Sequence, residues 1–220
     1  PSGNRAPDNK GGAGYDQTRA DFDFDRGSNA AATRIGSDGL LKKYRENVLL
    51  QSNAFSTSPW NLSSATISGG QSGYDGSENA WLFTTSVAGA ALAQSFSQTG
   101  VVSFSVYAKA GSVNGIRLRI DTNSDGNGYF DLVNGTTFYS GAIDSSIENV
   151  GGGWYKCSVS HNVSGPVKLQ FFTTDGTSSY DNGTILIQSA QLESGLVASS
   201  YLNSTSVTGK AGVLVDMPRI

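Results

Sequence analysis

The sequence predicts an all-β protein, and two observations carry that prediction. Glycine is abundant, with 28 among 220 residues, while charged residues make up only 15% of the chain. Short apolar runs recur between clusters of Ser, Thr, Asn and Gly, which are turn residues. Several short strands without a helical pattern predict a β-sandwich of the jelly-roll type.

The strand-like runs begin at residue 47, and the sandwich is predicted to span residues 47–205. The clearest runs are "NVLLQS", "NAWLFTTS", "VVSFSVYAKA", "GIRLRI", "GYFDLV", "WYKCSVSHNV", "VKLQFFTT" and "TILIQSAQLE". The stretch "SVAGAALAQSFS" is interpreted as strand or loop, because Gly89 and its serines weaken a helix. A short C-terminal strand is expected within residues 206–220.

The N-terminal region differs from the rest of the chain in composition and pattern. Residues 1–20 are polar and rich in Gly and Asn, which predicts an extended arm that is ordered only when a partner holds it. Within residues 21–46, "DFDFDR" alternates strictly and predicts a half-buried strand with Phe22 and Phe24 inward. The segment "ATRIGSDGLLKKY" predicts a hairpin that turns at residues 37–39.

The totals argue against several classes of function. The net charge of -3 makes no case for nucleic-acid binding. Cys157 is the only cysteine, so neither an intrachain disulfide nor a cysteine-based zinc site can form, and it is interpreted as a small core residue. No apolar run approaches the roughly 20 residues that span a bilayer, so no membrane insertion is predicted.

One stretch resembles a calcium loop. In "RIDTNSDGNGYFDLV", Asp121, Asn123 and Asp125 repeat the opening of that motif. The twelfth position holds Leu132 instead of a bidentate Glu, and strand-like runs flank the motif instead of helices. A hairpin turn is therefore favoured and no cofactor is predicted, with Asp121, Asn123 and Asp125 as the ligands in the alternative case of a bound calcium ion.

Longer segments resemble a domain that is common in bacteriophage tail and virion proteins. They are "RADFDFDRGSNAAATRIGSDGLLKKYRENVLLQSNAFSTSPW", "FSVYAKAG", "GWYKCSVS", "AQLESG", "SSYLNSTS" and "VLVDMPRI", in the expected order. That domain is similar to carbohydrate-binding modules with a concanavalin-like jelly roll. Such modules often hold a structural calcium with an Asp pair on the last strand, where this chain has Gln188 and Ser189.

The resemblance implies a tail or head appendage, or a decoration protein, of a phage particle that acts outside the cell. The arm would contact other virion proteins, and the sandwich would attach to host-surface polysaccharide. A purely architectural module, whose sheet face contacts protein, is the alternative. A homo-oligomer is compatible with either, and no heptad repeat sets the number of subunits.

Strand alternation assigns a candidate binding face. The apolar members of each run, such as Val102, Phe104 and Val106, are expected to point inward. The outward positions are basic and aromatic: Tyr107, Lys109, Arg117, Arg119, Trp154, Lys156, Lys168, Gln170 and Phe172. If the strands share one sheet, aromatic rings would stack on sugars and guanidinium groups would favour carboxylated or sulfated ones. A solvated or protein-covered face is the competing interpretation.

Catalysis is not predicted. A glycosidase needs two carboxylates placed across the scissile bond, and concanavalin-like glucanases supply them from an E-x-D-x-E strand, which this chain lacks. The nearest acidic alternation is Asp21, Asp23 and Asp25, outside the predicted sandwich. His161 is interpreted as lying at a strand end. A polysaccharide-degrading enzyme is therefore the least favoured alternative. Trp60 and Trp81 are expected at the core or its edge.

Overall fold

The computed structural model describes residues 33–35, 41–43, 45–122 and 126–211. Their regular structure consists of strands, which confirms the all-β prediction. The compact unit that carries the sandwich comprises Arg45–Ala211. In the other unit, β1 (Thr33–Ile35) pairs antiparallel with β2 (Leu41–Lys43), as the hairpin prediction requires. The predicted turn at 37–39, the arm at 1–20 and the strand at 21–26 lie outside the described residues.

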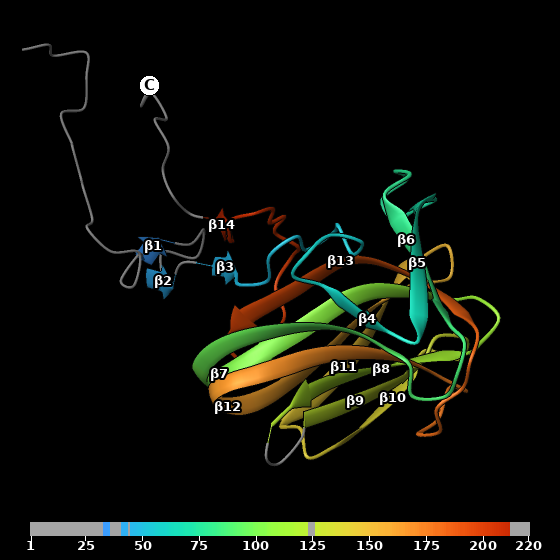
Figure 1. Ribbon diagram of the computed structural model, residues 1–220. Coiled ribbons are helices and arrows are strands. Elements are labelled where there is room, and N and C mark those ends of the chain that lie inside the picture. The colour runs from blue at the N-terminus through green and yellow to red at the C-terminus, as the bar shows by residue number, and fades with distance from the viewer. Residues whose placement is uncertain (1–32, 36–40, 44, 123–125, 212–220) are drawn as a thin grey trace, which may run out of the picture. The chain divides into compact units, whose positions relative to one another are not determined.

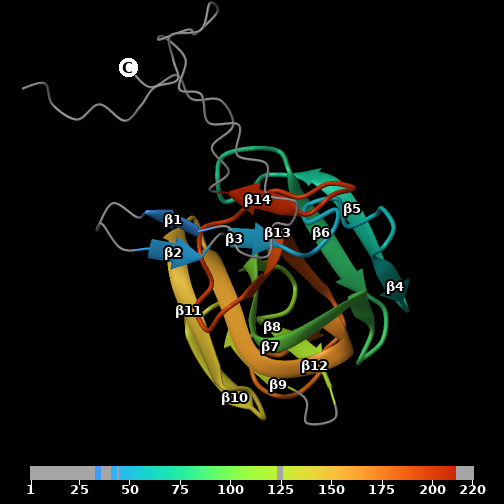
Figure 2. The ribbon, with the colours of Figure 1, turned by 90° about the vertical axis from the view of Figure 1, so that its left-hand side faces the viewer.

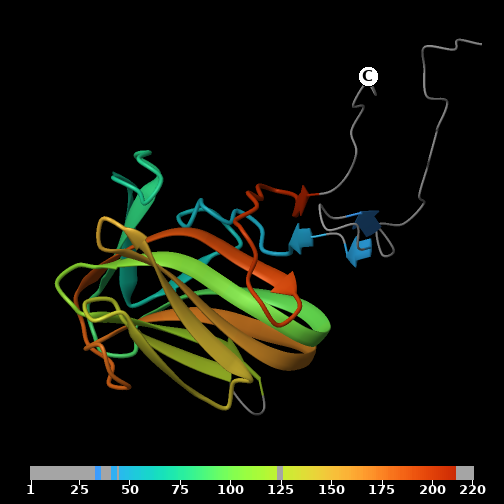
Figure 3. The ribbon, with the colours of Figure 1, turned by 180° about the vertical axis from the view of Figure 1, so that it is seen from behind.

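Two long strands organise the sandwich. β7 (Ala91–Ala110) and β12 (Trp154–Thr174) pair antiparallel along almost their whole length. The pair bends midway, where Gly100 and Gly165 both have positive φ angles, of 103° and 88°, that side-chain-bearing residues rarely adopt. Figures 1, 2 and 3 show the two strands curving together, and in Figure 2 orange β12 descends one side and then turns along the bottom. The bend places each half of the ribbon in a different layer.

The first layer contains the C-terminal half of β7 and the N-terminal half of β12. Its strands, in pairing order, are β5 (Ala65–Gln71), β6 (Ala80–Thr85), β13 (Thr184–Ser194), β7, β12 and β11 (Asp144–Gly151). All of these pairs are antiparallel. We call this layer the first sheet.

The second sheet contains the other two halves of the same ribbon. Its strands, in pairing order, are β4 (Asn61–Ser63), β7, β12, β8 (Gly115–Asp121), β9 (Gly126–Asp131) and β10 (Thr136–Ser140). β8 and β9 form an antiparallel hairpin, which confirms the hairpin interpretation of the calcium-like stretch. The stretch interpreted as strand or loop supplies the start of β7.

The apolar core lies between the sheets. The inward residues predicted from alternation are buried, apart from Tyr155, which is partly buried at the edge of the core; Val102, Phe104 and Val106, for example, have no exposed surface. Rings from both sheets meet there, since Phe104 and Phe171 lie 5.1 Å apart between centroids. The core cluster draws on both sheets: Phe83, Val102, Phe104, Val106, Ile116, Leu118, Ile120, Phe130, Cys157, Val159, Leu169, Phe171, Ile185, Ile187 and Leu192.

Other predictions about single residues can be settled here. Trp60 is 7% exposed and packs against Phe55, and Trp81 contacts the edge of the core, as expected. Cys157 is fully buried, and burial raises the pKa of its thiol. The placement of His161 at a strand end was wrong: it lies inside β12 and is 5% exposed, because β12 continues through the bend.

Segments before and after the sandwich strands close one end. β3 (Arg45–Asn47) pairs with β14 (Gly209–Ala211). The buried amide of Asn47 donates to the carbonyls of Ala190 and Leu202 and accepts from the backbone N–H of Leu192. No helix among the described residues is long and apolar enough to cross a membrane.

Candidate functional site

The bend in the β7–β12 ribbon divides the nine residues of the predicted face between two outer surfaces. The outer surface of the first sheet carries Tyr107, Lys109, Trp154 and Lys156. The outer surface of the second sheet carries Arg117, Arg119, Lys168, Gln170 and Phe172. The structure therefore brings these residues together as groups of four and five and does not form the single basic face that one flat sheet would present.

On the first sheet, the aromatic residues are engaged by the chain itself. Tyr107 stacks on Tyr74 with ring centroids 3.7 Å apart and planes 2° from parallel. Trp154 is only 3% exposed and lies edge-on to Tyr74 at 6.4 Å. Burial, together with the neighbouring Tyr74, raises the pKa of Tyr107 well above its ordinary value. Trp154 has too little exposed surface to serve as a platform for a sugar.

The loop that carries Tyr74 is fixed by the last long strand. Gln188 on β13 donates to the carboxylate of Asp75 and accepts from the backbone N–H of Tyr74, both at 3.1 Å. The resemblance places an Asp pair for calcium at this point. In this chain, the amide of Gln188 instead ties the loop to the sheet, and that contact holds Tyr74 over Tyr107.

A second segment also lies on this surface, and we call residues 195–205 the strap. Lys156 Nζ donates to the carbonyls of Ala198 and Ser199 at 3.1 and 2.7 Å, and Ser160 Oγ donates to Leu196 O at 2.6 Å. Burial lowers the pKa of the Lys156 ammonium. Lys109 donates to Gly152 O at 2.7 Å. We call this surface of the first sheet the covered face, because the chain's own backbone occupies its polar groups.

Two segments that carried the family resemblance build this cover. "AQLESG" supplies Gln191 and Glu193, and "SSYLNSTS" supplies most of the strap. The Glu193 carboxylate accepts from Ser199 N at 2.6 Å, from Ser199 Oγ at 2.7 Å and from Gln191 Nε2 at 2.7 Å. Gln191 Oε1 in turn accepts from Leu202 N at 2.6 Å. In this structure both motifs serve the architecture of the sandwich.

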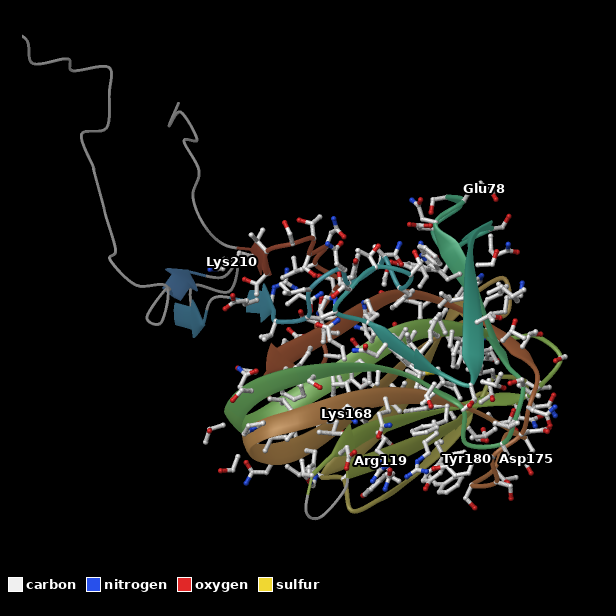
Figure 4. All side chains as sticks on the ribbon, in the orientation of Figure 1. Glu78, Arg119, Lys168, Asp175, Tyr180 and Lys210 are labelled. Atoms are coloured by element: carbon white, nitrogen blue, oxygen red, sulfur yellow. The ribbon has the colours of Figure 1, made fainter. Side chains whose placement is uncertain are left out.

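The outer surface of the second sheet, which we call the open face, is organised in rows across the strands. One row, read from β4 to β9, contains Asn61, Ala93, Gln170, Arg119 and Asn127. The next row, from β4 to β10, contains Ser63, Ala91, Phe172, Arg117, Tyr129 and Phe138. In Figure 4, Arg119, Lys168 and Tyr180 are labelled over this part of the molecule.

Small side chains on β7 create a groove in the open face. The outward positions of β7 are Ala91, Ala93 and Ser95, while β4 and β12 on either side carry longer side chains. The floor is therefore lower than its two walls, and the groove has a volume of about 460 Å³. Its lining consists of Asn61, Leu62, Ser63, Gly89, Ala91, Ala93, Ser95, Lys168 and Gln170.

Arg117 lies beside the groove at the centre of an aromatic ladder. Its guanidinium carbon is 5.2 to 5.3 Å from the ring centroids of Tyr129, Phe172 and Tyr180. It also donates to Asn127 Oδ1 from Nε at 3.1 Å and from Nη2 at 2.6 Å, and it hydrogen-bonds the Tyr180 hydroxyl. Arg117 is 9% exposed, so its donors serve the sheet and stiffen the surface beside the groove.

The rings of the ladder pack against one another in pairs. Tyr129 and Phe138 stack with centroids 4.6 Å apart and planes 4° from parallel. Phe172 is 4% exposed, whereas Phe138 and Tyr180 are 43% and 38% exposed. The two exposed rings are the ones that remain accessible to a ligand.

Arg119 connects the ladder to the groove wall. Its Nη1 donates to Gln170 Oε1 at 3.2 Å, and its Nη2 forms an ion pair with Asp121 at 3.1 Å. Of the three residues that would be the ligands of a calcium ion, the structure describes Asp121. Asn123 and Asp125 lie outside the described residues. Among the residues that the structure describes, no group of three or more His, Cys, Asp or Glu side chains is arranged to hold a metal ion.

Sequence reasoning did not single out several residues of the open face. They are Asn61, Ser63, Ala91, Ala93, Ser95, Tyr129, Phe138 and Tyr180. The alternating small residues of "ALAQS" were the available signal for the groove floor, since a row of small outward residues beside longer ones leaves a depression. No local signal placed β4 or Tyr180 beside β7 and β12, because those contacts join distant parts of the chain.

Comparisons with known proteins gave no family. No family model matches the chain, and no curated protein matches it. Among solved structures, the fold is similar to the CBM22-1 xylan-binding domain from Paenibacillus barcinonensis, with 16% sequence identity and a TM-score of 0.42 over 68% of this chain and 91% of that one.

Two larger solved proteins are also similar over part of their length. The CBM22-1-GH10 modules of endo-1,4-beta-D-xylanase 10B from Clostridium thermocellum show 10% identity and a TM-score of 0.41, over 73% of this chain and 29% of that one. The enzymatically active domain of tailspike protein 4 of bacteriophage CBA120 shows 13% identity and a TM-score of 0.38, over 66% and 21%. The assignment that follows therefore rests on this chain's own residues.

Proposed function

We propose that this chain is a non-catalytic polysaccharide-binding protein of a phage virion, and that the groove of the open face is its binding site. The observation that supports the proposal is the groove itself. Its floor is formed by Ala91, Ala93 and Ser95, and its walls carry the polar side chains of Asn61, Ser63, Lys168 and Gln170. The covered face holds a smaller pocket, of about 240 Å³, between β11, β12 and the strap. The Lys156 and Ser160 side chains of that pocket are already bonded to carbonyls of the strap, which favours the groove of the open face.

The chemistry of the groove suits a sugar chain. A pyranose ring has hydroxyl groups around its edge that need hydrogen-bonding partners. The two floor alanines are 6% and 9% exposed and offer little apolar area, so the polar walls carry the fit. Amide, hydroxyl and ammonium groups along both walls supply such partners. The groove follows the direction of β7, since its floor residues are successive outward positions of that strand. A linear polymer therefore fits this groove better than a compact molecule.

The virion location is a separate part of the proposal and rests on the sequence resemblance. In that arrangement, the N-terminal region contacts other virion proteins and the sandwich meets host-surface glycans outside the cell. The non-catalytic assignment is supported by the groove lining, whose described residues include neither the carboxylate pair nor the histidine that glycan cleavage commonly uses.

Binding of the full chain to a polysaccharide panel tests the proposal. Ala93→Phe places a ring on the groove floor and is expected to abolish binding. Thr66→Phe adds the same ring at an exposed position of β5 and is the matched control, expected to bind like the wild type. Both variants are compared with the wild type by thermal unfolding to show that they fold. Equal binding by all three proteins would rule out this groove as the site.

The same experiment separates the competing functions. If the folded wild-type chain binds no glycan, the architectural interpretation replaces this one. If new reducing ends appear when the chain is incubated with the polysaccharide that it binds, the non-catalytic assignment is wrong.

A further inference from the structure

The groove lining carries charge of one sign only, which is positive. Among the described residues that line it, Lys168 is the one with a charged side chain, and that side chain is exposed. Asp121 is paired in register with Lys168 on the adjacent strand, but its carboxylate forms the ion pair with Arg119. The groove therefore carries positive charge, although the whole chain has a net charge of -3. Non-specific attraction of the whole protein to anions does not account for this local charge.

The amide side chains on the two walls are oriented by their own neighbours. Gln170 Oε1 accepts from Arg119 Nη1 at 3.2 Å, which leaves the Gln170 NH₂ group to donate to a ligand. Asn61 Nδ2 donates to Pro59 O at 2.9 Å, which leaves Asn61 Oδ1 to accept. These two residues lie in the same row, on either side of Ala93. A donor thus stands opposite an acceptor across the groove floor.

The two observations give the groove a chemical polarity. The β12 wall presents donors, an ammonium and an amide NH₂, while the β4 wall presents an amide carbonyl. A ligand that matches both walls has an anionic group along one edge and hydroxyl donors along the other. Sugars that bear a carboxylate or sulfate group have this combination, and neutral sugars lack the anion that Lys168 would pair with.

We infer that the ligand is an acidic polysaccharide whose anionic groups contact Lys168 and Gln170 and whose hydroxyl groups donate to Asn61. This inference rests on the proposed function, since it assigns the substrate class of the same groove. It places the selectivity for acidic sugars on Lys168. Arg117 acts as a structural residue of the neighbouring ladder, because its donors are already bonded within the sheet.

The test measures the affinity of the full chain for three polymers: polygalacturonate, which carries carboxylates, dextran sulfate, which carries sulfates, and dextran, which is neutral. Lys168→Met keeps the aliphatic stem and removes the charge. It is expected to weaken binding to the acidic polymer about tenfold or more, which is the range for one charge-assisted hydrogen bond. Gln170→Glu adds a repelling carboxylate and is expected to weaken it further.

Lys109→Met is the matched control, because Lys109 belongs to the same β7–β12 ribbon but lies on the covered face and donates to Gly152 O. It should bind like the wild type. Raised salt should also weaken wild-type binding more than Lys168→Met binding, since screening acts on the charge that the variant lacks. The carboxylate and sulfate polymers show which anion the groove prefers.

The outcomes are distinguishable. Loss of acidic-polymer binding in Lys168→Met, with Lys109→Met unaffected, supports the inference. Unchanged binding in Lys168→Met, while Ala93→Phe abolishes it, overturns the inference and leaves the groove as a binding site for uncharged features of the sugar. Tighter binding to dextran than to either acidic polymer also overturns the inference. If Ala93→Phe has no effect, the proposed site itself is wrong.

Discussion

The two outer faces of this sandwich are made from the same two strands, yet they differ in what covers them. On the covered face, the outward Ser160 of the ribbon is 3% exposed, because the strap lies against it and accepts its hydroxyl at Leu196 O. On the open face, Ser95 is exposed and lines a groove. Strand alternation predicts which side chains point away from the core. What then covers an outward side chain depends on segments that are far away in the sequence.

Lys156 and Lys168 show the difference within a single strand. Both are outward residues of β12, one before the bend and one after it. Lys156 is bonded to two carbonyls of the strap, so its donors are used within the fold. Lys168 is exposed at a groove wall, where its charge can serve a ligand. Residues with the same sequence pattern therefore have different roles in the two layers.

The largest expected effect is on the covered face. Glu193→Ala removes a 5%-exposed carboxylate that accepts from Ser199 and Gln191. The variant should lose about 2–3 kcal/mol of unfolding free energy, because the half-buried N–H and hydroxyl of Ser199 lose their charged acceptor. Urea denaturation measures the loss. Glu148→Ala, an exposed position on the same face, is the control and should change stability by less than about 0.5 kcal/mol. Equal losses in both variants would contradict the structural role of the strap.

A smaller loss is expected from the aromatic ladder of the open face. Arg117→Met removes the guanidinium that three rings surround and leaves Asn127 Oδ1 without these donors. The unfolding free energy should fall by about 1–3 kcal/mol. Arg119→Met, at a more exposed position, should cost less than about 1 kcal/mol. If Arg117→Met is as stable as the wild type but loses glycan affinity as strongly as Lys168→Met, then Arg117 is a ligand-binding residue and its structural assignment is wrong.

The two lysines of β12 give the sharpest contrast at a still smaller energy. Lys156→Met should lower the unfolding free energy by about 1 kcal/mol, because two carbonyls of the strap lose their donor. Its glycan affinity should not change. Lys168→Met should leave stability within about 0.5 kcal/mol and weaken binding. Chemical denaturation and polysaccharide binding are measured on both proteins. If the two variants change in stability and in glycan affinity to the same extent, the two lysines do not have the different roles assigned to them.

The smallest effect concerns acid stability and the loop over the covered face. The hydrogen bond from the Ser77 side chain has the largest effect on the pKa of Asp75; burial opposes it, and the hydrogen bond from Gln188 adds to it, so that the pKa lies below its ordinary value of 3.8. Because the folded-state pKa is lowered, the stabilisation is present above 3.8 and is lost as the pH falls through the folded pKa. Asp75→Asn should therefore flatten the fall in Tm between about pH 6 and about pH 2. A Tm curve parallel to that of the wild type would show that Asp75 contributes nothing to this fall.

Much of the framework was predictable from local patterns. Alternation in "VVSFSVYAKA" and "GIRLRI" identified the inward residues correctly, since a strand that packs on a core must bury every second side chain. The turn residues of the calcium-like stretch predicted a hairpin, and β8 and β9 form one. The run that contains His161 was misjudged because a strand that bends between two layers looks like two strands with a turn between them.

The candidate site was predictable only in part. The sequence by itself determined the all-β class, the inward and outward sets, and the basic outward residues, because these depend on a period of two along each strand. Only the tertiary structure decided which outward residues share a surface, because the bend near Gly100 and Gly165 moves Lys156 and Lys168 into different layers. The tertiary structure also decided that the strap covers one face while small residues of β7 leave a groove in the other.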